Sequence, residues 1–151
     1  APAIPKAVKS FLSDTSSFSP EWSGSILRML PESVRGAYPL LREHLRILSA
    51  GICIGEAKGK DFIPAEELAL STALRPDAFP VADLDWDDAI RYLKKEALLL
   101  PAGTEKGYVL VRHKKFPLGF AKHLGNRANN LYPQEWRIRT GYVPEQVKTF
   151  E

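Results

Sequence analysis

Residues 108–139 read YVLVRHKKFPLGFAKHLGNRANNLYPQEWRIR, an apolar start followed by a dense group of cations. Seven residues of this stretch are Lys or Arg and one is acidic, so its formal charge is +6, whereas the whole chain carries +3. Histidines, asparagines, a tyrosine and a tryptophan stand between the cations. Amides and aromatic faces beside Lys and Arg suit a ligand that carries phosphates and bases. The stretch therefore points to nucleic acid as the ligand.

The same part of the chain predicts a small meander of β-strands. We expect strands at 97–100, 108–113 and 118–123, joined by turns at 103–107 and 113–116. Phe120 alternates with Leu118 along the last of these strands and is expected in the core. Residues 124–133 hold a glycine, an asparagine pair and a proline, a composition that disfavours a further strand.

Two amphipathic helices are predicted before the meander, at 62–74 and 86–96. Pro64 stands in the first turn of the first helix, where proline is tolerated, and Asp85 is a good N-cap for the second. The expected buried stripes are Ala65, Leu68, Ala69 and Ala73 in the first helix, and Trp86, Ala89, Ile90 and Leu93 in the second. Residues 75–82 contain two prolines and are expected to connect the two helices.

The N-terminal part gives shorter signals. We expect a short helix within 3–12, a Ser-rich loop at 13–25, a strand at 25–31, a turn of helix at 38–44, a strand at 46–57 and a turn at 58–61. Gly51 and Gly55 lie inside the second of these strands. Glycine in a strand often marks a place where another backbone approaches closely.

The composition is that of an ordinary globular protein with one domain or two small ones. The chain has 151 residues, of which 44% are hydrophobic and 26% charged. Its one cysteine, Cys53, excludes an internal disulfide and fits a reducing compartment, so we expect a cytoplasmic protein. Cys53 lies in an apolar run, where a cysteine is usually a small buried hydrophobe. No run approaches the roughly 18 apolar residues of a membrane span.

No catalytic signature is present in the sequence. It contains no glycine-rich dinucleotide motif and no phosphate-binding loop. The three histidines are too scattered for a helix-borne metal pair, and one cysteine cannot form a thiolate metal site. Residues 61–90 hold eight acids against one arginine, which gives a clear asymmetry of charge along the chain. These acids either form a solvated face, repel RNA from the wrong side, or dock on a basic neighbouring domain.

The segment PLGFAKHLGNRANNLYPQEWR, residues 117–137, resembles the end of a PUA-like RNA-binding domain. This domain stands at the C-terminus of the ribosomal RNA small subunit methyltransferase F group, which are Sun-type RNA cytosine-5 methyltransferases. The family pattern is a strand, a PLG-x-x-K step, a G-x-R-x-x-N-x-YP step and a basic residue. The matching residues are Tyr108–Val111, Pro117, Leu118, Gly119, Lys122, Gly125, Arg127, Asn130, Tyr132, Pro133 and Arg137. Residues 46–70 and 84–98 resemble the preceding segments, so the resemblance covers roughly 26–139.

The resemblance implies an α+β chain. Its main part would be a PUA-like mixed β-barrel with short flanking helices, preceded by a small α/β segment. The expected domains are 1–25, an N-terminal helix and linker; 26–80, the small α/β segment; and 81–151, the PUA-like RNA-binding domain.

The family's catalytic half, with its cofactor-binding core and two catalytic cysteines, has no counterpart in this sequence. The resemblance therefore implies a non-catalytic region that binds no cofactor and no metal, within a parent enzyme whose catalytic domain uses S-adenosylmethionine. Its implied partners are the ribosomal RNA of the small subunit and the parent's own catalytic domain. The chain starts at Ala1, and Met29 is its only methionine, so we expect an excised part of a longer protein or a processed short one.

Eleven residues are the predicted RNA contacts. They are Arg112, Lys114, Lys115, Lys122, His123, Arg127, Asn129, Asn130, Tyr132, Arg137 and Arg139. We expect Arg112, Lys122, Arg127 and Arg137 on phosphates, and Asn129, Asn130 or Tyr132 on base or ribose. An alternative for Asn130 and Tyr132 is that they brace the NNLYP turn through backbone hydrogen bonds.

Two other functions are compatible with these residues. In the first, the region is a docking domain that packs on the catalytic half and makes little direct contact with RNA. A large exposed apolar patch would be its mark. In the second, the chain is a small enzyme of a PUA-related fold, which the lack of paired acids or of a nucleophile beside a base disfavours.

Overall fold

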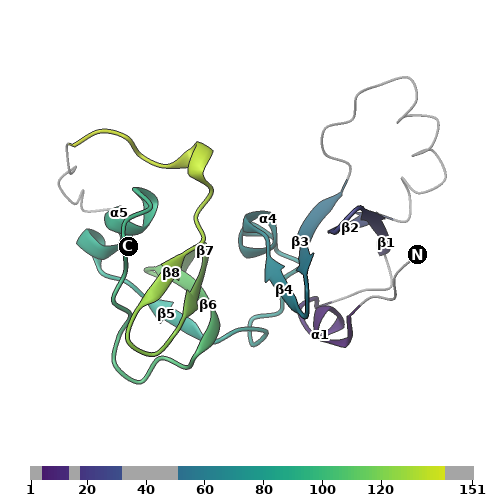
Figure 1. Cartoon of the computed structure of the whole chain (residues 1–151), viewed down its shortest axis with the longest axis horizontal. Coiled ribbons are helices and arrows are strands. Elements are labelled where there is room, and N and C mark those ends of the chain that lie inside the picture. The colour runs from purple at the N-terminus through teal and green to yellow at the C-terminus, as the bar shows by residue number, and fades with distance from the viewer. Residues whose placement is uncertain (1–4, 14–17, 32–50, 142–151) are drawn as a thin grey trace. The chain divides into compact units, whose positions relative to one another are not determined.

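Two four-stranded sheets hold most of the β-structure in the computed structural model (Figure 1). The structure describes residues 5–13, 18–31 and 51–141. The chain divides into two compact units, Ala1–Ala78 and Phe79–Glu151, with one sheet in each. Two sheets with few helices confirm the α+β class. Closure into a barrel and the division into three domains stay predictions.

The first unit is built on an antiparallel meander in the order β1-β2-β3-β4. Its elements are α1 (Lys6–Lys9), β1 (Phe18–Ser23), β2 (Ile26–Pro31), β3 (Ile52–Lys58), β4 (Asp61–Pro64) and α4 (Glu66–Leu70). The predicted short helix, the strand at 25–31 and the turn at 58–61 are confirmed, and the strand predicted at 46–57 is confirmed from residue 52. The helical turn predicted at 38–44 lies outside the described residues.

Two predictions for this unit are wrong. The loop predicted at 13–25 contains β1, because Gly24, at a φ of +60°, closes a tight turn that pairs Ser23 with Ile26. The helix predicted at 62–74 starts only at Glu66 and ends at Leu70. Residues 61–64 form β4 instead, since pairing with β3 satisfies their backbone groups.

Glu66 of α4 is a largely buried acid of the first unit. Both carboxyl oxygens of Glu66 are buried and have no hydrogen-bond partner among the described residues. Burial raises the pKa of this carboxyl to about 8. An unfolded glutamate ionises near pH 4.3. The unfolded chain therefore gives up this proton at lower pH than the folded one, so the stability of the first unit falls as pH rises from about 4 to about 8.

The variant Glu66→Gln is expected to flatten this dependence on pH. It should equal the wild type near pH 4 and exceed it at pH 9 by roughly 1 to 3 kcal/mol, because Gln cannot ionise. Amide hydrogen exchange of β2 and β3, measured from pH 5 to 9, would read the stability of this unit. Glu56→Gln, at an exposed carboxylate of the same unit, is the control. Parallel pH profiles for the wild type and Glu66→Gln would contradict the assignment.

The second unit is a mixed sheet with one well-formed helix. Its elements are β5 (Val81–Asp83), α5 (Trp86–Leu93), β6 (Gly107–His113), β7 (Phe116–His123), β8 (Ala128–Asn130) and the 3₁₀ helix η1 (Gln134–Trp136). The strand order is β5-β6-β7-β8, with β5 parallel to β6 and the other pairs antiparallel. Asp85 caps α5 as predicted, since its side chain accepts a hydrogen bond of 2.8 Å from the Asp88 amide.

The second unit also corrects three predictions. The connector predicted at 75–82 ends inside β5, and the strand-poor stretch contains β8. The strand predicted at 97–100 is reduced to one bridge, between Leu98 and Ala128. β5 is stabilised by parallel pairing with β6, and β8 is stabilised by antiparallel pairing with β7. Both pairings are tertiary contacts, so local composition does not reveal these two short strands.

The core of this unit lies between α5 and one face of the sheet. It consists of Leu84, Ala89, Tyr92, Leu98, Val111, Ala121 and Ala128. Tyr92 is fully buried and donates a hydrogen bond of 2.9 Å from its hydroxyl to the carbonyl of Phe120. The ring of Phe120 packs edge-on against Phe79, with centroids 4.8 Å apart. Phe120 is thus a core residue, as predicted.

Candidate nucleic-acid interface

The register of β6, β7 and β8 brings three side chains into a row. Lys122 of β7 lies opposite Tyr108 of β6 on one side and opposite Asn129 of β8 on the other. Directly opposed residues of antiparallel strands share a face of the sheet. The Lys122 Nζ atom lies 5.1 Å from the centroid of the Tyr108 ring, within reach of a cation–π contact. The row offers a cation, an aromatic ring and an exposed amide together.

The β6–β7 hairpin carries a second group of cations. His113 pairs with Phe116, so Lys114 and Lys115 form a two-residue loop, and both lysines are exposed. Their φ angles are 46° and 69°, in the left-handed region that two-residue hairpin loops use. A residue with a side chain is disfavoured there by roughly 1 to 2 kcal/mol. The loop therefore carries two cations where glycine or asparagine would fit with less strain.

Arg112, at the base of this hairpin, is already paired. Its Nε and Nη2 atoms donate to the two carboxyl oxygens of Asp83, at 3.0 and 2.9 Å. The two residues are register partners across β5 and β6. Hydrogen bonding to Asp83 raises the pKa of Arg112. The pair fixes the hairpin to β5 and balances the charge of one predicted phosphate contact.

Asn130 forms a brace between β8 and the end of α5. Its Nδ2 atom donates to the carbonyls of Tyr92 and Glu96, at 2.9 and 3.0 Å. Its Oδ1 atom accepts a hydrogen bond of 2.9 Å from the amide of Tyr132. These three hydrogen bonds to backbone groups use both N–H donors and one of the two acceptor lone pairs of the amide side chain. This geometry favours the bracing alternative for Asn130.

Tyr132 and Lys95 complete this brace. The Tyr132 ring packs edge-on against Tyr92 and Trp136, at centroid distances of 5.4 and 6.4 Å. Lys95 donates from Nζ to the carbonyls of Asn130 and Tyr132, at 3.1 and 2.6 Å. From the sequence, Lys95 was interpreted only as a cation that favours the C-terminal end of the helix predicted at 86–96.

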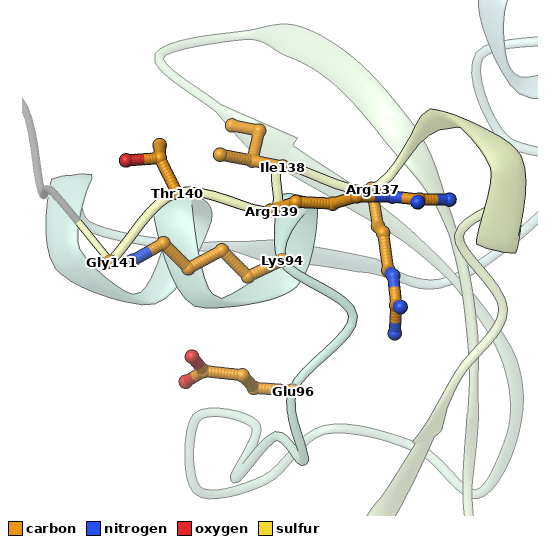
Figure 2. Close-up of a pocket in the computed structure, with 7 residues that line it drawn as sticks. All are labelled: Lys94, Glu96, Arg137, Ile138, Arg139, Thr140 and Gly141. Atoms are coloured by element: carbon orange, nitrogen blue, oxygen red, sulfur yellow. The ribbon is translucent and has the colours of Figure 1, made fainter.

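Arg137 and Arg139 lie at a pocket beside the C-terminal end of α5. The pocket has a volume of about 370 Å³ and is lined by Lys94, Glu96, Arg137, Ile138, Arg139, Thr140 and Gly141. Figure 2 shows Lys94 at the C-terminal end of α5 and Glu96 on the segment that follows the helix, with Arg137, Ile138 and Thr140 above them. The amide of Ile138 donates a 2.9 Å hydrogen bond to the Leu93 carbonyl and ties the segment to the helix.

The predicted contacts are thus distributed rather than gathered in one spot. Lys122 and Asn129 share one face of the sheet, and the hairpin holds Lys114 and Lys115. Arg127 is exposed in the β7–β8 turn. His123 is the last residue of β7, and its Nδ1 atom is 3.1 Å from the Glu105 carbonyl. The residues that sequence reasoning missed are Tyr108 and Phe116, because Tyr108 was expected inside a strand and Phe116 inside the turn at 113–116.

The described part of the chain gives little support to a cysteine nucleophile, a metal site or a membrane-spanning helix. Burial raises the pKa of the Cys53 thiol, so it stays protonated near neutral pH and is a poor nucleophile. No group of His, Cys, Asp and Glu among residues 5–13, 18–31 and 51–141 is arranged to hold a metal ion. In the same residues, no helix has the length and apolar character needed to cross a membrane.

The family model and the relatives that this chain matches agree with the resemblance of residues 117–137. Residues 79–138 match the family model described as Methyltransferase RsmF PUA domain. Proteins named Ribosomal RNA small subunit methyltransferase F from Shewanella baltica (strain OS195) and Shewanella pealeana (strain ATCC 700345 / ANG-SQ1) are each 32% identical to this chain. The matches cover 70% and 60% of this chain, and 22% and 18% of those relatives. The chain thus spans about a fifth of the length of the curated relatives it matches.

Proposed function

We propose that this chain is the RNA-binding accessory region of a ribosomal RNA cytosine-5 methyltransferase. Residues 79–138 match the family model of RsmF methyltransferase PUA domains, in agreement with the resemblance of the motif at 117–137. The chain grips RNA of the small ribosomal subunit and positions the target cytosine for a catalytic domain elsewhere in the parent protein. The observation that carries this proposal is the row of Tyr108, Lys122 and Asn129 in the family-matched unit, at the end of the β6–β7 ladder opposite the lysine-tipped hairpin loop.

In this role the region holds the RNA in a fixed position relative to the active site. A methyltransferase acts on a base that is taken out of the stack or is already unstacked. Contacts to phosphates fix the register of the RNA without reading its sequence. A rigid sheet with outward cations supplies such contacts at a constant distance from an active site in a neighbouring domain. The chemistry itself stays with that domain, which would bind S-adenosylmethionine as the methyl donor.

The double variant Lys122→Ala/Arg127→Ala is expected to bind small-subunit ribosomal RNA more weakly and with less dependence on salt. Each lost phosphate contact reduces the slope of log K against log salt by about one unit. Fluorescence anisotropy with labelled RNA fragments, at several salt concentrations, measures both quantities. The control is Lys58→Ala/Lys60→Ala, which removes the same charge from exposed positions of the first unit. Equal slopes for the two double variants would oppose this interface, and absent binding in every protein would oppose the function itself.

Exposed apolar side chains support a second candidate, docking on the catalytic domain. Leu99 is 79% exposed and Trp136 is 53% exposed. In this alternative the region packs on the catalytic half and makes little contact with RNA. A stable complex with the separately produced catalytic domain, unchanged by RNA and by Lys122→Glu but lost in Leu99→Asp, would favour docking over RNA binding.

A further inference from the structure

The β6–β7 hairpin presents an aromatic ring to solvent beside two lysines. Phe116 is 72% exposed, although a phenylalanine in a strand normally contributes to a core. It follows directly on Lys114 and Lys115, the two residues of the loop. A lone ring is too small for an apolar docking patch, which usually extends over several side chains. Its setting next to two cations suits a ligand that carries both negative charge and flat apolar faces.

The base of the hairpin is held rigidly, so the exposed ring has a fixed position. Arg112 is bound to Asp83 by two hydrogen bonds, as described above. The His113 ring packs edge-on against Trp86, at a centroid distance of 5.8 Å, and its Nδ1 atom lies 2.9 Å from the Leu84 carbonyl. Both contacts tie the end of β6 to the segment that joins β5 and α5. A ring on such a support loses little freedom when a ligand stacks on it.

We propose that Phe116 stacks on an unpaired base of single-stranded RNA, while Lys114 and Lys115 bind the phosphates on either side of that base. Every base has a flat face, so this contact tolerates any sequence. It discriminates against duplex RNA, because the faces of paired bases are already covered by their neighbours. The inference rests on the proposed RNA-binding function and adds to it the class of nucleotide that this hairpin takes.

The test compares the full chain with Phe116→Ala, Phe116→Tyr and Leu99→Ala on a labelled single-stranded RNA and on the same strand paired as a duplex. Phe116→Ala is expected to weaken single-strand binding about 5- to 100-fold, the range for losing one stacked base. Binding to the duplex stays unchanged. Phe116→Tyr keeps the wild-type affinity, since it preserves the ring. Leu99→Ala, at an equally exposed apolar position, has no effect.

Salt dependence separates stacking from charge. Phe116→Ala should leave the salt slope unchanged, because it removes no phosphate contact, whereas Lys114→Ala/Lys115→Ala should lower it by about two units. An RNA with abasic sites should bind the wild type more weakly and should erase the difference between the wild type and Phe116→Ala.

Each of the following outcomes would overturn the inference, and each would point to a different cause. If Phe116→Ala binds both RNAs like the wild type, stacking at this site is wrong while RNA binding stands. If the wild type binds neither RNA, the inference and the proposed function fail together. Equal losses on single strand and duplex, accompanied by a lower melting temperature, would assign Phe116 a role in folding. Loss of affinity for the catalytic domain, with RNA binding intact, would identify the hairpin as a protein contact.

Discussion

Asn130→Ala is expected to lower the free energy of unfolding of the second unit by about 2 to 4 kcal/mol. The substitution removes hydrogen bonds to the carbonyls of Tyr92 and Glu96 and to the amide of Tyr132. Each such bond contributes about 1 kcal/mol, and a buried partner left unsatisfied adds to the loss. Chemical denaturation, together with amide exchange in β7 and β8, would measure the change.

The neighbouring asparagine is the matched control for this effect. Asn129 is exposed on the opposite face of β8, beside Lys122. Asn129→Ala should leave stability within about 0.5 kcal/mol of the wild type, while lowering RNA affinity if this face binds RNA. The reverse pattern, with Asn130→Ala fully stable and weak in RNA binding, would show that Asn130 contacts the ligand and that the brace is dispensable.

This pair of asparagines shows how far the sequence predicts the site. The family match to residues 79–138 supports the resemblance carried by the motif at 117–137, whereas the individual RNA contacts stay predictions. The sequence left two roles open for Asn130, because an amide suits a base edge and a turn equally well. The hydrogen bonds from Asn130 to the end of α5 favour bracing, and contact of Asn130 with RNA stays a prediction. Phe116 was missed for a related reason, since the exposure of one aromatic depends on where the hairpin ends.

The fold was predictable where local chemistry dominates. Asp85 caps α5 through its own side chain, so this signal lies within a few residues of the start of the helix. The short strands β5 and β8 were missed because partners distant in sequence stabilise them. The helix predicted from residue 62 began late for the same reason, as β3 captures residues 61–64 in a ladder.

Gly51, just before β3, and Gly55, within it, illustrate a local signal with a structural cause, as predicted. A Cβ atom at Gly51 would collide with the backbone carbonyl of Met29, and Gly51 also has a φ of +81°. A Cβ atom at Gly55 would collide with the carbonyl of Ile63 and the ring of Phe62. The obstructing oxygens belong to backbone in paired strands, so they cannot move aside without breaking the sheet.

Gly55→Ala is therefore expected to destabilise the first unit by about 3 kcal/mol or more, at the upper end of the cost of overpacking. The β3–β4 hairpin would have to open, since the added methyl group occupies the place of the Ile63 carbonyl. Amide exchange in β3 and β4 would report the loss, with β6 and β7 as internal references in the other unit. Gly59→Ala is the matched control in the same hairpin, because nothing lies within 4 Å of its Cβ position and only its φ of +61° opposes the substitution. That control should lose only about 1 kcal/mol. Equal stability of the two variants would mean that β4 does not lie against β3 at Gly55, and residues 61–64 would then be free to join the helix that the sequence predicted.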